Sequence, residues 1–210
     1  IWNDNRQYGE NLQKRAKGEL DEMESSKALC EVIKPYYQPG LTLLDVGCAA
    51  GHYLRSLRER IDPDVQYTGT DATAYYIELA QKALPDRTFV QGDIFDLPFE
   101  DKQFDIVMCN NVLLHLPPPP IKPISELMRV AKKTLIIRTV FGERNYVVQE
   151  IREPGEYDTG HDIPPILFKD NGEAHQFNYF NMYTEEHIRW VVNTIDPGAK
   201  VSIIEDKWWQ

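Results

Sequence analysis

Short apolar runs alternate with amphipathic helical patterns between about residues 40 and 140 of the chain. Two of these runs, residues 41–46 and 104–109, have the length and apolarity of strands that are buried on both faces of a sheet. Further elements are predicted as strands at residues 65–70, 87–91 and 134–140, helices at residues 51–61 and 74–84, and a helix with Ile124, Leu127, Met128 and Ala131 on one face. This alternation predicts an α/β fold: a doubly wound, Rossmann-like sheet that is mostly parallel and lies in three αβα layers.

The segments on either side of this core, which spans residues 40–140, have other patterns. Residues 1–39 predict a helical lead-in. Residues 183–210 predict a helix capped by Thr184 and a last strand at residues 200–205. No room remains for a further strand, so we expect all 210 residues to form one domain whose C-terminal edge is truncated.

A long stretch, residues 143–182, separates the fifth predicted strand from the C-terminal helix. Acids outnumber bases in it, and aromatic residues are interleaved with them. A stretch of this length is unusual as a plain connection in a compact domain, which predicts a lid insertion over a substrate. The candidate substrate-binding residues in it are Tyr146, Tyr157, His161, His175 and Tyr179.

Small residues follow the first predicted strand directly. Gly47, Ala49, Ala50 and Gly51 leave little side chain in this turn, so we expect a ligand to approach the backbone closely. The helix that follows places its N-terminal N–H groups and its positive dipole end beside the turn. Such a helix end favours an anionic ligand group.

Polar residues also end the next three predicted strands. Asp71, Asp93 and Asn110 lie at or just beyond the ends of the second, third and fourth strands. In open parallel sheets, ligands bind beyond the carboxyl ends of the strands, where the strand order reverses. Four successive strand ends with suitable residues therefore predict a ligand site at this edge.

The glycine pattern of the turn separates two classes of ligand site. The dinucleotide fingerprint G-x-G-x-x-G does not fit, because Ala49 and His52 occupy its second and third glycine positions. The pattern acid-x-G-x-G-x-G with one substitution fits Asp45, Gly47, Ala49 and Gly51. This stretch resembles motif I of the class I S-adenosylmethionine-dependent methyltransferases. The resemblance extends over about residues 40–140, and among these enzymes the chain is most similar to the small-molecule type 11 and type 12 domains.

The resemblance implies S-adenosylmethionine as cofactor and S-adenosylhomocysteine as product. Motif I would hold the methionine part, Asp71 would accept hydrogen bonds from both ribose hydroxyls, and Asp93 would accept from the adenine amine. A carboxylate suits both positions because it offers only acceptors. The implied cofactor-binding residues are Asp45, Gly47, Cys48, Ala49, Gly51, Asp71, Ala72, Asp93, Ile94 and Asn110.

The segment after the fourth strand resembles that of small-molecule methyltransferases, which often carry a histidine there. His115 is the first candidate for a catalytic base, with His161 and His175 behind it. We expect methyl transfer to an oxygen or nitrogen atom of a small-molecule metabolite. The motif Asn-Pro-Pro-Tyr, which serves amino-group methylation of bases, is missing after the fourth strand.

Composition excludes several other classes. The formal net charge of −10 argues against a partner that is a nucleic acid. No run has the length of a membrane-spanning helix, and no signal peptide opens the chain, so we expect no membrane partner. The three cysteines form no close pair, which favours a reduced, cytoplasmic setting. Histidines and acids lack metal-ligand spacing, so no metal is expected, and the oligomeric state is left open.

Two other functions remain open on the sequence alone. A NAD-dependent oxidoreductase would have the same sheet, and Asp71 would again hold a ribose. A non-catalytic binding module would keep the fold without the reaction. The individual residues have plainer interpretations too: Asp71 and Asp93 as turn caps, His115 as a packed histidine, and residues 143–180 as a solvated loop.

Overall fold

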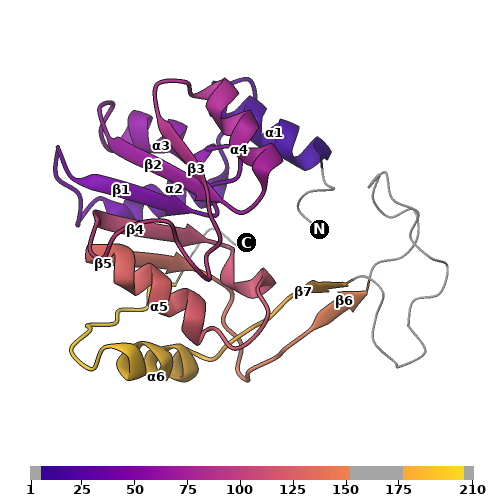
Figure 1. Ribbon diagram of the computed structural model, residues 1–210, viewed down its shortest axis with the longest axis vertical. Helices are drawn as coiled ribbons and strands as arrows, with labels where there is room; N and C mark the ends of the chain where they lie inside the picture. The colour runs from indigo at the N-terminus through magenta and orange to yellow at the C-terminus, as the bar shows by residue number, and fades with distance from the viewer. Residues whose placement is uncertain (1–5, 152–176, 206–210) are drawn as a thin grey trace.

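A five-stranded parallel sheet lies at the centre of the computed structural model, which describes residues 6–151 and 177–205. The strands are β1 (Thr42–Val46), β2 (Gln66–Asp71), β3 (Thr88–Gln91), β4 (Phe104–Asn110) and β5 (Ala131–Arg138). Their order in space is β3-β2-β1-β4-β5, so the winding reverses between β1 and β4 (Figure 1). The predicted doubly wound parallel sheet is confirmed.

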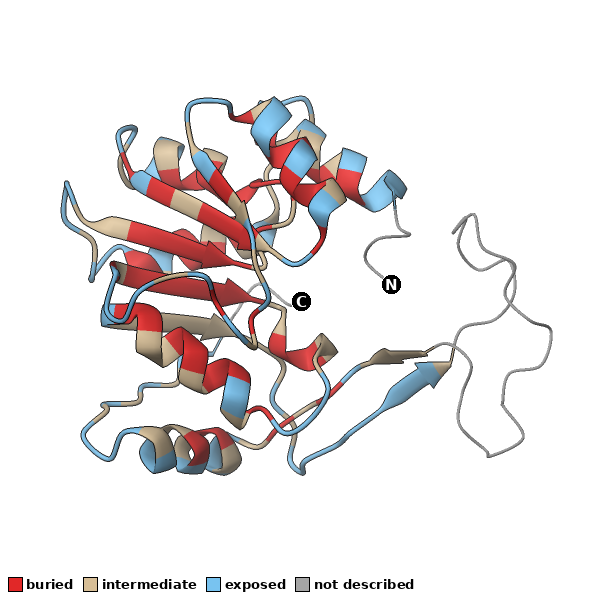
Figure 2. Cartoon of the chain, viewed as in Figure 1, coloured by how far each residue is buried: buried red, intermediate tan, exposed pale blue. Residues whose placement is uncertain are grey.

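Helices cover both faces of the sheet. One face packs against α2 (Glu24–Ile33), α3 (Tyr53–Arg60) and α4 (Ala74–Ala83). The other face packs against α5 (Ile121–Val130), and α6 (Glu185–Ile195) lies against α5 (Figure 1). Side chains alternate along β1, so that Leu43 enters the first core and Leu44 the second. Burial on both faces, visible in Figure 2, explains why the central strands are so apolar in sequence.

The N-terminal lead-in consists of two helices, because α1 (Arg6–Lys17) precedes α2. The break follows Gly18, whose φ of +80° suits glycine. Leu12 of α1 is buried in a cluster with Ala50 and Tyr76, so this helix packs onto α4 beside the turn after β1.

Two predicted elements differ at the C-terminal side. Residues 200–205, all within the described part of the chain, form no strand. The segment contacts α6 instead, because Arg189 of that helix donates a hydrogen bond to the Val201 carbonyl at 2.8 Å. Ile204 is 59% exposed, so the end of the segment is not packed in the core. The spacing predicted that Ala131 belongs to the apolar face of the helix. In the structure α5 ends at Val130, and Ala131 is the first residue of β5.

The predicted lid stretch contains a short antiparallel ribbon of β6 (Gln149–Ile151) and β7 (Phe177–Tyr179). The ribbon projects from the side of the sheet where the strand arrows end (Figure 1). Its base is anchored by the buried Asn181, which donates from its backbone to the Leu114 carbonyl at 2.8 Å and from its side chain to the Leu116 carbonyl at 2.7 Å. The role of this stretch as a lid stays a prediction.

Candidate active site

The four predicted strand ends meet at one edge of the sheet. Val46 pairs with Thr70 on one side and with Cys109 on the other. At the next positions out, Asp71 pairs with Gln91 and Asn110 with Arg138. The turn after β1 therefore lies between Asp71 and Asn110, at the point where the strand order reverses.

The turn after β1 has a backbone that few residue types adopt. Gly47, Ala49 and Gly51 have φ values of +78°, +46° and +75°, in the left-handed region. The Gly47 and Cys48 N–H groups donate to the Thr70 carbonyl at 2.8 and 3.0 Å, which ties the turn to the end of β2. Ala49 holds an unfavourable conformation for a residue with a side chain.

The glycines of this turn are needed for packing as well as for backbone conformation. A Cβ atom on Gly47 would lie 2.3 Å from Cγ2 of Val112, and one on Gly51 would lie 2.9 Å from Cδ1 of Leu84. Protein side chains therefore occupy the Cβ direction of both glycines, and the approach of a ligand to the backbone of the turn stays a prediction.

Asp71 braces the turn with both of its carboxylate oxygens. Oδ2 accepts from the Ala49 N–H and Oδ1 from the Thr73 N–H, each at 2.9 Å. The turn-cap interpretation is therefore realised in part, but a carboxylate has about four acceptor sites, which leaves capacity for hydroxyl donors. Burial raises the pKa of Asp71, and the bonds from Thr73 and Ala49 act against that shift.

The segment after β3 lies beside Asp71. The Gly92 N–H donates to the Asp71 carbonyl at 3.0 Å, which fixes the start of the segment. Asp93 is exposed, and its Oδ1 accepts from the Phe95 N–H at 3.0 Å, while Ile94 is buried in the core. Asp93 therefore forms a turn, as its plainer interpretation predicts, and its side chain is exposed.

Asn110 ends β4 with its side-chain amide buried. The side chain is 7% exposed, and neither its Oδ1 nor its Nδ2 has a partner within the described structure. An orphaned buried amide at a strand end is a feature of a binding site, since such groups are otherwise paired.

Asp45 is buried within β1 and accepts a hydrogen bond from the Tyr67 hydroxyl at 2.7 Å. Burial raises the pKa of Asp45 to about 7, and the nearby Asp71 carboxylate adds to this. The Cys48 thiol is also buried, and burial raises its pKa, as expected of an unreactive thiol. The sequence did not indicate Tyr67, because a partner of Asp45 on a neighbouring strand has no local signal.

His115 ends the short 3₁₀ helix η1 (Leu113–His115) and contacts the ribbon. Its Nδ1 lies 3.0 Å from the Tyr179 carbonyl, and its ring meets that of Phe180 edge-on. A carbonyl only accepts, so Nδ1 carries the proton and Nε2 carries the lone pair. Burial lowers the pKa of His115, which makes the neutral form dominant at neutral pH.

The remaining predicted residues divide into two groups. Ala72 is exposed at the end of β2, and Tyr146 is exposed beside β6. Tyr157, His161 and His175 lie outside the described residues.

The structure adds side chains that sequence reasoning missed. Arg138 ends β5 beside Asn110, and its guanidinium donates to Oδ1 of Asn111 at 2.8 Å. On the other side of the site, burial lowers the pKa of His52, which follows the turn, to about 3. The predicted strand at residues 134–140 ran past Arg138, so its position at the end of β5 had no signal in the sequence.

The described residues hold no cluster of three or more histidines, cysteines or acids that would suit a metal ion. None of the described helices combines the length and the apolar composition needed to cross a bilayer.

A family model described as "Methyltransferase domain" matches residues 44–137. The match includes the turn after β1, Asp71, Asp93, Asn110 and His115, all within the parallel sheet and its connections. This part of the chain, which is less than half of the 210 residues, is therefore similar to methyltransferase domains.

The chain is similar to two curated proteins whose names give methyl transfer to quinone-type compounds. It is 33% identical over 101 residues to the 2-phytyl-1,4-naphtoquinone methyltransferase of Trichormus variabilis, a match that covers 45% of this chain and 44% of that protein. It is 35% identical over 65 residues to the demethylmenaquinone methyltransferase of Thermotoga maritima, covering 31% and 28%. The matches thus span less than half the length of these relatives.

Solved structures share the fold of this chain. A SAM-dependent methyltransferase from Methanosarcina mazei has a TM-score of 0.52 at 17% identity, with 78% of this chain and 82% of that chain covered. A Pyrococcus horikoshii protein has a TM-score of 0.54 at 17% identity, with coverage of 80% and 78%. At these identities the likeness concerns the fold alone.

Proposed function

We propose that the chain transfers a methyl group from S-adenosylmethionine to an oxygen or nitrogen atom of a small-molecule metabolite and releases S-adenosylhomocysteine. The observation that carries the proposal is the position of Asp71: its carboxylate holds the turn after β1 while it lies next to the Asp93 turn. A ligand with donors at a ribose and an adenine fits two acceptors placed in this way.

Other groups at this edge suit the remaining part of the cofactor. The turn from Gly47 to Gly51 would lie along the methionine part, and the amide of Asn110 would contact its amino group. The orphaned Oδ1 of Asn110 supports this assignment, because an ammonium group would supply the missing donor. Arg138, across from Asn110, adds a positive charge on the side of β5.

The cofactor, when bound, supplies a methyl group that is already activated on a sulfonium. The chain then has to orient the acceptor atom, and such positioning provides a large part of the rate enhancement. His115 would take the proton from the acceptor O–H or N–H at Nε2, since Nδ1 is engaged with the Tyr179 carbonyl. Its lowered pKa supports this role, because the neutral ring is the basic form.

The acceptor is proposed to be neutral or cationic and apolar in part. The excess of acids in residues 143–182 disfavours a polyanion. Exposed apolar side chains gather near the ribbon at Tyr146, Val147, Val148 and Phe180. A quinone-type aromatic compound, as named for the relatives, is therefore the second candidate acceptor.

The test is methyl transfer from S-adenosylmethionine carrying a radiolabelled methyl group to a panel of amines, phenols, quinols and sugars. We expect labelled product and S-adenosylhomocysteine in equal amounts with at least one acceptor. Cofactor binding without transfer to any of these compounds would favour the binding module. A chain that binds NAD instead would be an oxidoreductase.

A further inference from the structure

The connection from β3 to β4 crosses the sheet without a helix, unlike the other crossovers between parallel strands. Residues 92–103 form this crossover loop, and α3, α4 and α5 occupy the corresponding places elsewhere. Parallel strands are usually joined by a helix, which pairs its own backbone groups. A loop at this place needs other partners for its N–H and carbonyl groups.

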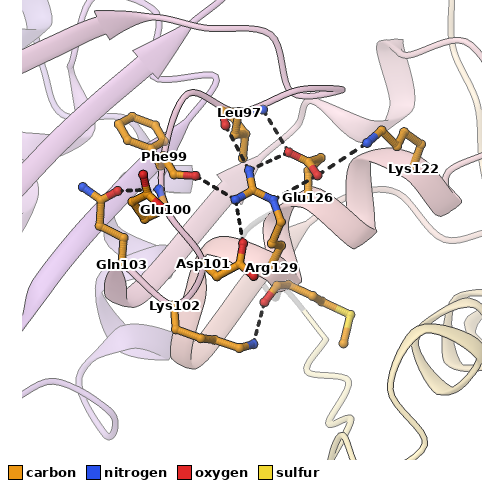
Figure 3. Close-up of polar contacts among 10 residues, drawn as sticks. Leu97, Phe99, Glu100, Asp101, Lys102, Gln103, Lys122, Glu126 and Arg129 are labelled. Atoms are coloured by element: carbon orange, nitrogen blue, oxygen red, sulfur yellow. Dashed lines mark hydrogen bonds and ion pairs between the residues drawn. The ribbon is translucent and has the colours of Figure 1, made fainter.

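Two side chains of α5 supply these partners. Glu126 accepts from the Leu97 N–H at 3.0 Å, and Arg129 donates to the Leu97 carbonyl at 2.9 Å (Figure 3). Arg129 also donates to the Phe99 carbonyl at 2.7 Å and to the Asp101 carboxylate at 3.0 Å. One arginine thus holds three positions of the crossover loop.

The two side chains also hold each other. Arg129 donates to both oxygens of Glu126, at 3.1 Å from Nε and 2.8 Å from Nη2, in a two-pronged pair. The side chain of Glu126 is 8% exposed, and the hydrogen bonds from Arg129 lower its pKa to about 2. The pair therefore stays charged, and its geometry is fixed at the C-terminal half of α5.

Asp93 belongs to the crossover loop, and hydrogen bonds before and after this residue fix its position. At the start, the Gly92 N–H is bonded to the Asp71 carbonyl. The Asp96 N–H then donates to the Asp93 carbonyl at 2.9 Å, which closes the turn, and the next residue is Leu97. The clamp at Leu97 therefore holds the far end of the turn that presents the Asp93 carboxylate.

We propose that Glu126 and Arg129 are positioning residues for the adenine end of the cofactor, acting through the crossover loop. The proposal rests on the proposed function, in which Asp93 accepts from the adenine amine. Side chains that meet a ligand need support that holds them within a fraction of an ångström. Loss of the clamp should therefore weaken the contact to the amine more than contacts to the rest of the cofactor.

The test measures the preference for an adenine amine in the full chain. Dissociation constants are measured by calorimetry for S-adenosylhomocysteine and for S-inosylhomocysteine, in which an oxo group replaces the amine. We expect the wild type to prefer the first ligand by at least tenfold, about 1.4 kcal/mol. In Arg129→Gln the preference should fall to about threefold or less.

Arg60→Gln is the matched control. Arg60 forms the same kind of two-pronged pair with Glu22, at 2.8 and 2.6 Å, between α3 and the segment before α2. This variant loses a comparable clamp whose two bonds involve no residue of the crossover loop, so its preference should equal that of the wild type. Arg129→Lys, which keeps the charge but not the fork, replaces Arg129→Gln if the latter does not fold.

The outcomes separate the two proposals. An unchanged preference in a folded Arg129 variant would overturn the positioning role while leaving the proposed function in place. An equal loss of preference in Arg60→Gln would overturn it too, because the effect would then be general destabilisation. A wild type that binds neither ligand would overturn both proposals.

Discussion

Replacing Gly47 by alanine tests why a glycine stands in the turn after β1. The structure gives two separable costs for Gly47→Ala. The φ of +78° is unfavourable for any residue with a side chain, at about 1–2 kcal/mol. The new Cβ would also lie 2.3 Å from Cγ2 of Val112, and such overpacking costs typically about 1–3 kcal/mol.

Two further variants separate these costs. Val112→Ala removes the clashing methyl group, and alone it should cost about 1–2 kcal/mol for two methyl groups of a half-buried side chain. The double variant should be less destabilised than the sum of the single variants by about 1–3 kcal/mol, because the clash is gone while the backbone strain and the cost of Val112→Ala remain. Gly40→Ala is the control, since Gly40 has a φ of +88° and no atom within 4 Å of its Cβ position.

The assay is urea unfolding followed by circular dichroism, with equal m values as the check on comparable transitions. Gly47→Ala should be destabilised by more than Gly40→Ala, and only Gly47→Ala should couple to Val112→Ala. Additivity of the two substitutions within about 0.5 kcal/mol would refute the packing argument.

Three further predictions concern single residues of the site. For Asp45, burial raises the pKa to about 7, above the unfolded value of about 3.9, so the folded chain keeps a proton that the unfolded chain releases. Wild type should therefore lose stability, relative to Asp45→Asn, as pH rises from about 4 to 7; urea midpoints that run parallel for both chains would contradict this. For His115, the lowered pKa predicts that methyl transfer is constant at neutral pH and falls with acid below the ordinary histidine pKa near 6.5. His115→Gln should lose that acid limb and about 10²-fold or more in kcat, whereas a variant with the same pH–rate profile as wild type would exclude the base. For Ala49, with a φ of +46°, Ala49→Gly should stabilise the chain by about 0.5 kcal/mol, and a lower thermal midpoint would show that the strain is not there.

The core strands were predictable because both of their faces are buried. β1 and β4 begin and end within about one residue of the apolar runs at residues 41–46 and 104–109. The alternation of strands and helices predicted the parallel sheet, and with it the meeting of Asp71 and Asn110 at one edge, whereas the order of the strands comes from the structure.

Packing and pairing with distant partners were not predictable. α1 is polar in sequence, and its packing depends on Gly9, where a Cβ would lie 2.6 Å from the Tyr76 ring. In residues 200–205 the alternation of apolar residues resembles a strand, but alternation alone does not supply a neighbouring strand with free hydrogen-bonding groups. The sequence pattern does not show whether an edge strand of the sheet lies close enough to pair with residues 200–205.

The candidate site also has features that were predictable from the sequence and features that were not. Its residues could be located from strand ends, but the bonds of Asp71 to Ala49 and Thr73 depend on how two turns meet in space. The same holds for the Glu126–Arg129 clamp, since its target at Leu97 lies 29 residues before Glu126 in the chain.

Calorimetric titration of the wild-type chain with S-adenosylhomocysteine and, separately, with NAD tests which cofactor the strand-end edge of the sheet binds. We expect saturable binding of one S-adenosylhomocysteine per chain and no binding of NAD. Binding of NAD, or no binding of S-adenosylhomocysteine at millimolar concentration, would contradict the claim that the edge formed by Asp71, Asp93 and Asn110 is a site for S-adenosylmethionine.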